Sequence, residues 1–353
     1  MTPFVHQNNP SRVIFGPGVL ARLPEEIQRL GLSRALVLST PEQAASAEEV
    51  ATLLGKHAAG VFSKAVMHVS IETAREVREV ASRLGADCAV AIGGGSTIGL
   101  GKAIALDSGL PVIAVPTTYA GSEMTPIYGL TEAGVKKTGR DPRVLPVSVI
   151  YDPQLSATLP LGMSVVSAIN AIAHGAEALY AHDGSPIVSL MAEEGIRASA
   201  AALTPLLANA QNMDARSDAL YGAWLCGSVL GMVSMGLHHK LCHTLGGSFN
   251  LPHAEVHTVI LPHALAYNAS HAPDAMTRIA RALGTDDPAH GVLELARRSG
   301  APTTLAAIGM PIEGLDRAAD LAAQSVYPNP RPLERDALRR LLQNAFDGTL
   351  SNS

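Results

Sequence analysis

The first third of the chain alternates short runs of β-branched residues with amphipathic stretches, and this alternation constrains the fold more than any other feature. Strands are expected in five places, at residues 13–15, 35–39, 60–63, 87–92 and 112–115. Ahead of the fourth run, apolar residues at positions 71, 74, 77, 80 and 84 recur at near-helical spacing, with charged residues on the other side. Such alternation is typical of a mostly parallel sheet with helices on its faces. The sequence therefore predicts an α/β, Rossmann-like N-terminal domain.

The second half has a different pattern. Beyond the segment VSVIYDPQL the strand signal nearly vanishes, and long runs rich in alanine and leucine take over, as at residues 185–207 and 215–235. We place the boundary near Asp152 and Pro153, because proline lacks a backbone donor and disfavours a helical conformation in the preceding residue. The expected division is an α/β dinucleotide-binding domain at residues 1–155 and an all-α catalytic domain at residues 156–353.

Composition excludes several classes of protein. Hydrophobic residues make up 47% of the 353 positions and charged residues 16%, which indicates a compact globular chain. The net charge of −5 and the short, scattered basic pairs do not form a surface that follows nucleic acid. No apolar run reaches the roughly 18 residues of a membrane span, and the N-terminus has no leader pattern. We expect a cytoplasmic protein that binds neither nucleic acid nor membrane.

The three cysteines have no CxxC spacing, which predicts buried free thiols in a reducing compartment. One of them, Cys242, lies within a histidine-rich stretch. A ligand or reactive role for this thiol is the alternative to inert packing.

A glycine-rich loop, GGGS at residues 93–96, follows the fourth expected strand, and helical residues resume at about Ile98. Glycines between a strand and a helix N-terminus let backbone amides approach a pyrophosphate, which the helix dipole also favours. The loop departs from the GxGxxG register, and Lys102 is followed by alanine where a P-loop requires serine or threonine. The sequence therefore predicts a dinucleotide site and does not support ATP hydrolysis.

Hydroxyl groups follow two other expected strands, in the segments STP at residues 39–41 and PTTYAGSE at residues 116–123. Because parallel strands end at one edge of a sheet, these groups are expected to border the same site, although turn chemistry alone explains the second segment as well. No acid follows the second strand to select the ribose 2′-hydroxyl, so NADH and NADPH both remain open. The expected cofactor-binding residues are Ser39, Thr40, Gly93, Gly94, Gly95, Ser96, Thr117, Thr118 and Ser122.

A second set of polar residues marks the helical half. The stretch at residues 236–263 holds six of the thirteen histidines: His238, His239, His243, His253, His257 and His263. Read as a helix up to a break at Gly246 and Gly247, it places His239 and His243 on one face. Asn170 and His174 have the same four-residue spacing. Together with His253 after the break, these pairs predict one polar pocket, the alternative being surface or core-capping histidines.

Four segments follow one another along the chain: GGGSTIGLGKAIA, PTTYAGSEMTPIYG, NAIAHGAEALY and HHKLCHTLGGSFNLPH. Together they resemble the iron-containing alcohol dehydrogenase superfamily, and within it the maleylacetate reductases. The resemblance runs from the FGPG at residues 15–18 to the NPRP at residues 329–332. It implies the two-domain architecture shared with dehydroquinate synthase, NADH or NADPH as cofactor, and a homodimer. Gly99 departs from the family's alcohol dehydrogenases, which commonly carry aspartate there.

The resemblance also bears on metal binding. In metal-dependent members of the superfamily an aspartate and three histidines hold a divalent ion, and these positions fall on Asn170, His174, His239 and His253. An asparagine oxygen is a neutral and weaker ligand than a carboxylate. No tightly bound metal is therefore expected, in keeping with the reductases, which are regarded as metal-independent.

The implied substrate is maleylacetate, a small dicarboxylate with an enone, reduced to 3-oxoadipate in the degradation of aromatic compounds. Hydride addition to the alkene moves charge onto the ketone oxygen, which needs a hydrogen-bond donor and a proton for the adjacent carbon. We expect His243 or His253 to supply both. The expected catalytic set is His243, His253, His239, His174, Lys240 and Asn170, in which His174, His239 and Lys240 position the carboxylates. Lys240 as a solvated helix lysine and His68 as a cleft or loop residue remain open.

Three competing functions are kept. A metal-dependent alcohol or aldehyde dehydrogenase of the same superfamily would retain a metal on Asn170. A dehydroquinate synthase-like lyase would need a strongly bound metal and basic residues that clamp phosphate, and neither is evident. A non-catalytic nucleotide-binding module would leave the histidine cluster unexplained.

Overall fold

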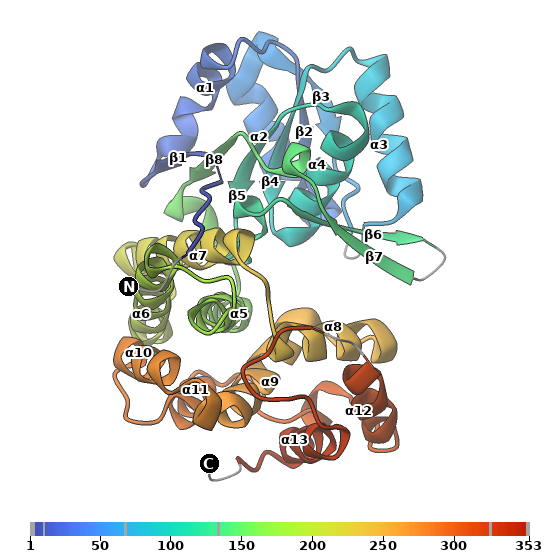
Figure 1. The fold of residues 1–353 in the computed structure, drawn as a ribbon. Helices are drawn as coiled ribbons and strands as arrows, with labels where there is room; N and C mark the ends of the chain where they lie inside the picture. The colour runs from blue at the N-terminus through green and yellow to red at the C-terminus, as the bar shows by residue number, and fades with distance from the viewer. Residues whose placement is uncertain (1–3, 10, 67–68, 133–134, 325–326, 351–353) are drawn as a thin grey trace. The chain divides into compact units, whose positions relative to one another are not determined.

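The structure is a computed structural model, and it describes the chain except residues 1–3, 10, 67–68, 133–134, 325–326 and 351–353. The described residues form two compact units (Figure 1). One unit is α/β and spans Asn8–Leu159. The other is helical, begins at Pro160, and includes residues 4–7 from the start of the chain. The predicted fold class is confirmed, while the observed division lies at Leu159 and Pro160, beyond the expected boundary.

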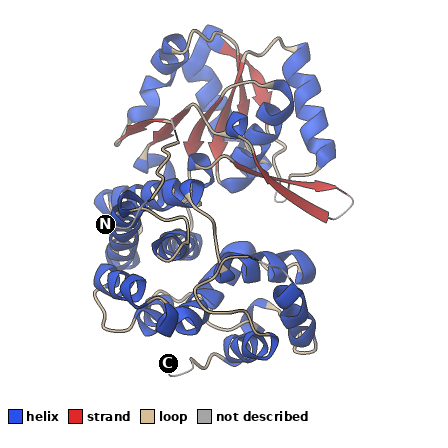
Figure 2. Ribbon diagram, viewed as in Figure 1, coloured by secondary structure: helices blue, strands red, loops and turns tan. Residues whose placement is uncertain are grey.

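The α/β unit is built on a six-stranded parallel sheet (Figure 2). In spatial order its strands are β1 (Arg12–Phe15), β8 (Ser148–Tyr151), β5 (Val112–Pro116), β4 (Cys88–Gly93), β2 (Ala35–Leu38) and β3 (Ala58–Phe62). The chain leaves β2 towards β3 and leaves β4 towards β5. The point where the strand order reverses therefore lies between β2 and β4, and α/β folds bind ligands beyond the carboxyl ends of the strands at such points.

All five predicted strands are confirmed, with ends that differ by two residues or fewer. An antiparallel hairpin of β6 (Ile127–Glu132) and β7 (Val135–Arg140) was not predicted. Helices α1 (Leu23–Arg29), α2 (Ala44–Leu54), α3 (Ile71–Arg83) and α4 (Gly95–Ser108) accompany the sheet. Leu23, Ile27 and Val50 join Val37 and Val90 of the strands in one buried cluster. Apolar burial on a fully covered parallel sheet explains the near-continuous hydrophobic runs of β2 and β4.

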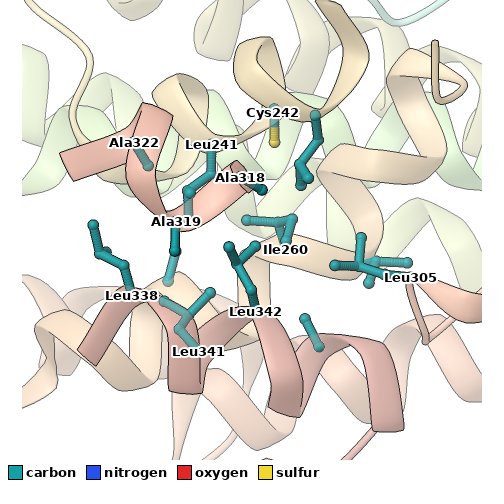
Figure 3. Close-up of a cluster of buried hydrophobic side chains, with 14 of the residues drawn as sticks. Leu241, Cys242, Ile260, Leu305, Ala318, Ala319, Ala322, Leu338, Leu341 and Leu342 are labelled. Carbon is teal, nitrogen blue, oxygen red and sulfur yellow. The ribbon is translucent and has the colours of Figure 1, made fainter. Parts of the chain in front are cut away.

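The described part of the second unit has nine α-helices and no strand. They are α5 (Leu161–Leu179), α6 (Pro186–Ala208), α7 (Met213–Met232), α8 (Leu237–Phe249), α9 (His253–Asn268), α10 (Pro273–Leu283), α11 (Pro288–Arg298), α12 (Gly314–Gln324) and α13 (Arg335–Asp347). A leucine- and alanine-rich core joins α8, α9, α12 and α13 (Figure 3). Cys242 belongs to this core, and all three cysteines are buried and free, as expected.

Helix α8 corrects one expectation. It continues through Gly246 and Gly247 and ends only at Phe249, where Asn250 has a left-handed backbone with φ of 53°. Glycine retains its amide and costs only about 1 kcal/mol relative to alanine in a helix, so two glycines do not stop a helix that buries leucines on one face. The chain turns at Asn250 instead, and His253 becomes the first residue of α9.

No single described helix is both long and apolar enough to cross a membrane. Helices α7 and α8 meet the length and composition limits only as a pair, which is bent by 95° between them.

Candidate active site and cofactor loop

Three helices of the helical unit bring the predicted polar residues together. Asn170 and His174 lie on α5, His239 and His243 on α8, and His253 at the start of α9. The ring centroids of His174 and His239 are 4.9 Å apart, and those of His239 and His243 are 6.4 Å apart. His257, which the prediction did not select, connects the group, since its ring lies 5.0 Å from His239 and 4.5 Å from His253.

The cluster has a buried part and an exposed part. Asn170, His174 and His239 are each 5% exposed or less, whereas His243 and His253 are exposed on the helical unit. Lys240 is also exposed, and its Nζ lies 5.7 Å from the ring centroid of Tyr327. The two histidines that we expect to donate protons are therefore the ones a ligand of this unit can reach.

A buried carboxylate anchors the cluster. Glu177 on α5 accepts a hydrogen bond from His239 Nδ1 at 2.7 Å, and its side chain is fully inaccessible. Burial opposes ionisation, but the hydrogen bonds from the His239 ring and from the backbone amide of His238 contribute to lowering the pKa of Glu177 to about 2. Glu177 is therefore an anion at neutral pH. Since a carboxylate only accepts, His239 must carry its proton on Nδ1.

The proton on His239 determines the role of His174. A neutral imidazole with Nδ1 protonated offers a lone pair on Nε2. His239 Nε2 lies 2.8 Å from His174 Nδ1, so in this neutral form of His239 the His174 ring donates and the His239 ring accepts. Glu177, His239 and His174 thus form a directional chain of hydrogen bonds.

His238 and His257 form a second buried pair, with 2.9 Å between Nε2 of the first and Nδ1 of the second. Burial lowers the pKa of His238 to about 3 and that of His257 well below its usual range. Cys242 Sγ lies 3.7 Å from His238 Nε2. The donor atoms of these three residues fall within 4.8 Å of one another. His238 Nδ1 and His257 Nε2 are buried without a hydrogen-bond partner among the described residues, and burial raises the pKa of the thiol well above its usual range. Packing is therefore the better account of Cys242.

The donor set fits a tightly held divalent metal poorly. Asn170 Oδ1 is buried and has no hydrogen-bond partner among the described residues, so a ligand atom is present. It is neutral, however, and His174 and His239 use facing nitrogens to bond each other. Glu177, the nearby anion, is committed to His239 Nδ1 and to backbone amides. A site of one amide oxygen and imidazoles lacks an anionic ligand, which lowers its affinity for a dication.

Glu177 was not among the predicted site residues, although a signal for it was present. It follows Asn170 by seven residues and His174 by three, which places all three on one face of a helix. Glu177 was not selected because a single acidic residue on a helix is usually exposed to solvent.

A cavity of about 480 Å³ also lies in the helical unit. It is bordered by Glu177, Tyr180, His271 and Asn329 among others. None of the predicted catalytic residues lines it, and Glu177 is the residue through which it adjoins the histidine cluster.

The glycine loop lies at the carboxyl end of β4. Gly93 has φ of 150°, and a Cβ there would overlap Thr97 Oγ1 and lie 2.8 Å from Gln43 Oε1. Helix α4 begins at Gly95, three residues before the expected start, because its first turn is formed by GST rather than by apolar residues. The backbone amides of residues 95–97 therefore occupy the first turn of a helix, which is the arrangement that suits a pyrophosphate.

The other predicted cofactor residues lie at neighbouring strand ends. Thr117 Oγ1 accepts from Gln43 Nε2 at 3.0 Å, and Thr118 packs near Gly94. Ser39 is buried and its hydroxyl bonds Ser63 at 2.9 Å, so its hydroxyl is used internally. Thr40 and Ser96 are partly exposed, on the loop after β2 and in the first turn of α4, and Ser122 begins a short helix after β5. His68 lies outside the described residues.

Lys102 of α4 is a buried cation whose contacts were not predicted from the sequence. Its Nζ donates to the carbonyl oxygens of Ser122 and Ile127, at 2.6 and 2.7 Å, and to Thr125 Oγ1 at 2.9 Å. Burial lowers the pKa of Lys102 to about 7, and the charge of Glu123 opposes this shift. The lysine ties the helix that follows the glycine loop to the segment that contains Ser122.

We expect Lys102 to make stability depend on pH. The folded protein loses this proton near pH 7, whereas the unfolded chain keeps it until about pH 10.5. Across that window the unfolded chain binds more protons, so the free energy of unfolding contributed by Lys102 rises by up to about 1.4 kcal/mol per pH unit. The free energy of unfolding, measured with urea, should rise for wild type relative to Lys102→Met from about pH 7 to about pH 9. If the free energies of unfolding of the two proteins changed equally with pH, the lowered pKa of Lys102 would be contradicted.

Comparisons with known proteins agree with this architecture. The family model described as iron-containing alcohol dehydrogenase matches residues 10–153, and the C-terminal model of the Fe-containing alcohol dehydrogenase family matches residues 164–346. A maleylacetate reductase from Burkholderia cepacia is 68% identical over 348 residues, which cover 99% of both chains.

Solved structures give the same result. The crystal structure of maleylacetate reductase from Agrobacterium tumefaciens superimposes with a TM-score of 0.97 at 53% identity, covering 99% of this chain and 100% of that one. A structure described as a putative alcohol dehydrogenase from Ralstonia eutropha JMP134 has a TM-score of 0.98 at 60% identity and full coverage of both chains. This chain therefore belongs to the iron-containing alcohol dehydrogenase family, and within it to the maleylacetate reductases.

Proposed function

We propose that the chain reduces the carbon–carbon double bond of maleylacetate to give 3-oxoadipate, with NADH or NADPH as the hydride donor. Relatives named maleylacetate reductase, up to 68% identical over the full chain, support the substrate. The observation that carries the proposal is the histidine cluster, in which exposed His243 and His253 adjoin buried His239 and His257. Membership in an oxidoreductase family leaves the lyase and the non-catalytic module without support.

The reaction requires three movements of charge. Bound NADH or NADPH would supply the hydride, which adds to the alkene carbon that is β to the ketone. The alkene electrons then move towards the ketone oxygen and form an enolate, which a hydrogen-bond donor stabilises. A proton finally adds to the adjacent carbon, and oxidised cofactor is released.

We assign the enolate donor and proton source to His243 or His253. Both are exposed, and imidazole exchanges protons near neutral pH. Lys240 is also exposed, so its ammonium suits a substrate carboxylate. His174 and His239 are buried and bonded to each other, and in this proposal they line the base of the carboxylate subsite together with Asn170.

For the cofactor, we infer that the amides of the first turn of α4 receive the pyrophosphate. Gly93, Gly94 and Gly95 allow its approach, with Ser96, Thr117, Thr118 and Ser122 as polar neighbours. Thr40 is placed at the switch point between β2 and β4, where the ribose of a dinucleotide lies in such folds. Ser39 contributes through its backbone, since its hydroxyl is bonded to Ser63.

We further propose that the enzyme works without a tightly bound metal. The neutral Asn170 and the direct bond between His174 and His239 support this. A homodimer, a cytoplasmic location and a functional division near residue 155 are the remaining proposals.

We expect turnover to be insensitive to chelation. Protein with its metal content determined should oxidise NADH in the presence of maleylacetate at the same rate with and without EDTA, because no step is assigned to a metal. Asn170→Asp is the matched variant, since it restores an anionic ligand and should increase bound zinc or iron. Loss of activity in EDTA, with metal-dependent turnover of simple alcohols, would favour the alcohol dehydrogenase alternative.

A further inference from the structure

We propose that Glu177 is a positioning residue for this reaction: it holds His239 in the neutral Nδ1–H tautomer and, through it, orients the rings that support His243 and His253. This inference rests on the proposed function for its catalytic consequence. Its structural part concerns the chain alone.

The first observation is the number of donors that converge on one carboxylate. Oε1 of Glu177 accepts from the backbone amide of His238 at 2.9 Å and from Tyr180 Oη at 3.1 Å. Oε2 accepts from the amides of Gly236 and His239, at 3.0 and 3.2 Å, and from His239 Nδ1 at 2.7 Å. Both oxygens are therefore used as acceptors.

Only a carboxylate satisfies this arrangement. A glutamine has one acceptor oxygen, and in either orientation its NH₂ group would face donors. The donors also include the first amides of α8, where the helix dipole favours a negative charge. Glu177 thus caps α8 with both oxygens, and Oε2 also accepts from the ring of its third residue, His239. A group that served only as a cap would not need to reach the His239 ring.

The second observation is the path from Glu177 to the exposed histidines. His239 packs edge-on against His257 with 5.0 Å between ring centroids, and His257 packs against His253 at 4.5 Å. The ring of His239 also lies 6.4 Å from that of His243, at an interplanar angle of 83°. Rotation of the His239 ring would therefore disturb both candidate proton donors. Catalytic geometry tolerates such displacements poorly.

The third observation is the hydrogen bond between His174 Nδ1 and His239 Nε2. If the only proton of the His239 ring were on Nε2, His239 would lose its hydrogen bond to Glu177. Its Nε2–H would also face the Nδ1–H of His174, unless His174 changed its tautomer as well. A buried polar bond that is left unmade costs about 1–3 kcal/mol. Of the two neutral tautomers of His239, the Nδ1–H form is therefore the one that satisfies Glu177, His239 and His174 together.

The direct test is nitrogen NMR of wild-type enzyme labelled with ¹⁵N-histidine. The His239 signals are identified by their loss in His239→Gln. We expect a protonated Nδ1 and an unprotonated Nε2 on His239, and a protonated Nδ1 on His174. A proton on His239 Nε2 would overturn the proposal. This measurement needs neither substrate nor a Glu177 variant that folds.

The catalytic consequence is tested with Glu177→Gln. We expect kcat with maleylacetate to fall about 10- to 100-fold, the usual cost of removing an orienting partner of a functional histidine. The KM for NADH should change little, because the glycine loop is in the other unit. In the same variant the nitrogen spectrum should show mixed tautomers of His239.

Tyr180→Phe is the matched control, because it removes one donor to Oε1 and leaves both contacts of Glu177 with His239. It should retain the wild-type tautomer and kcat. A Glu177→Gln protein that folds with an unchanged tautomer or unchanged kcat would overturn the inference. If wild type fails to reduce maleylacetate while the tautomers are as expected, the proposed function fails instead.

Discussion

Replacing the proton donor of the cluster is expected to lower kcat by about 10²- to 10⁴-fold, the range for loss of a general acid. We expect this loss in one of two single variants, His243→Ala or His253→Ala, and the affected variant identifies the donor. Both side chains are exposed on the helical unit and lie next to buried histidines whose orientation the fold determines. Steady-state NADH oxidation at saturating maleylacetate measures the effect.

The variants should leave the fold intact, because neither side chain belongs to the buried core. His290→Ala is a suitable control, since His290 is likewise exposed and is paired with Asp287 on α11, outside the cluster. It should retain wild-type turnover. If His243→Ala and His253→Ala both keep near-wild-type kcat, the assignment of the proton donor is wrong.

Replacing Gly93 by valine is expected to weaken NADH binding by about 100-fold or more, a free-energy change of roughly 3 kcal/mol. The φ of 150° at Gly93 is unfavourable for a β-branched residue. The new Cβ would also displace Thr97 and Gln43, and Gln43 holds Thr117 on the neighbouring loop. Titration of protein fluorescence with NADH measures the affinity.

Two other glycines separate the causes. Gly109 has φ of 69°, and a Cβ added there would have no atom within 4 Å, so Gly109→Ala tests backbone strain alone and should leave NADH affinity unchanged. Gly95 would accept a Cβ with its nearest neighbour at 3.9 Å, so Gly95→Ala should fold normally. Weaker NADH binding by Gly95→Ala would then report close approach of the pyrophosphate. Wild-type affinity in Gly93→Val would contradict the location of the site.

The sequence predicted the α/β half well because its signals are local. Strands β2 and β4 are continuous apolar runs. A parallel strand that is covered on both faces is recognised by such a run alone, without alternation of polar and apolar residues. The hairpin of β6 and β7 was missed because its residues are mixed in polarity and their pairing depends on each other rather than on the main sheet. The end of α8 was misplaced because glycine weakens a helix by less than the burial of Leu241 and Leu245 stabilises it.

In the candidate site, the spacing of residues in the sequence predicted which side chains share a face where both lie on one helix. The four-residue separations of Asn170 from His174 and of His239 from His243 indicated that each pair shares a face, and this depends only on helix geometry. The same spacing could not show that His174 and His239 would bond each other, because they are 65 residues apart and come from different helices. Nor could it separate exposed His243 and His253 from buried His238 and His257.

The sequence by itself therefore determined the fold class, the position of the glycine loop between a strand and a helix, and the set of histidines. These follow from periodicity, from backbone freedom at glycine, and from the chemistry of particular side chains. Tertiary structure decided which residues are buried, where protons lie, and how Glu177 and Lys102 are used. Segments distant in the chain determine which side chains are buried and which groups they bond. The pKa of a carboxyl or amino group is shifted by burial and by these partners, and the sequence alone shows neither.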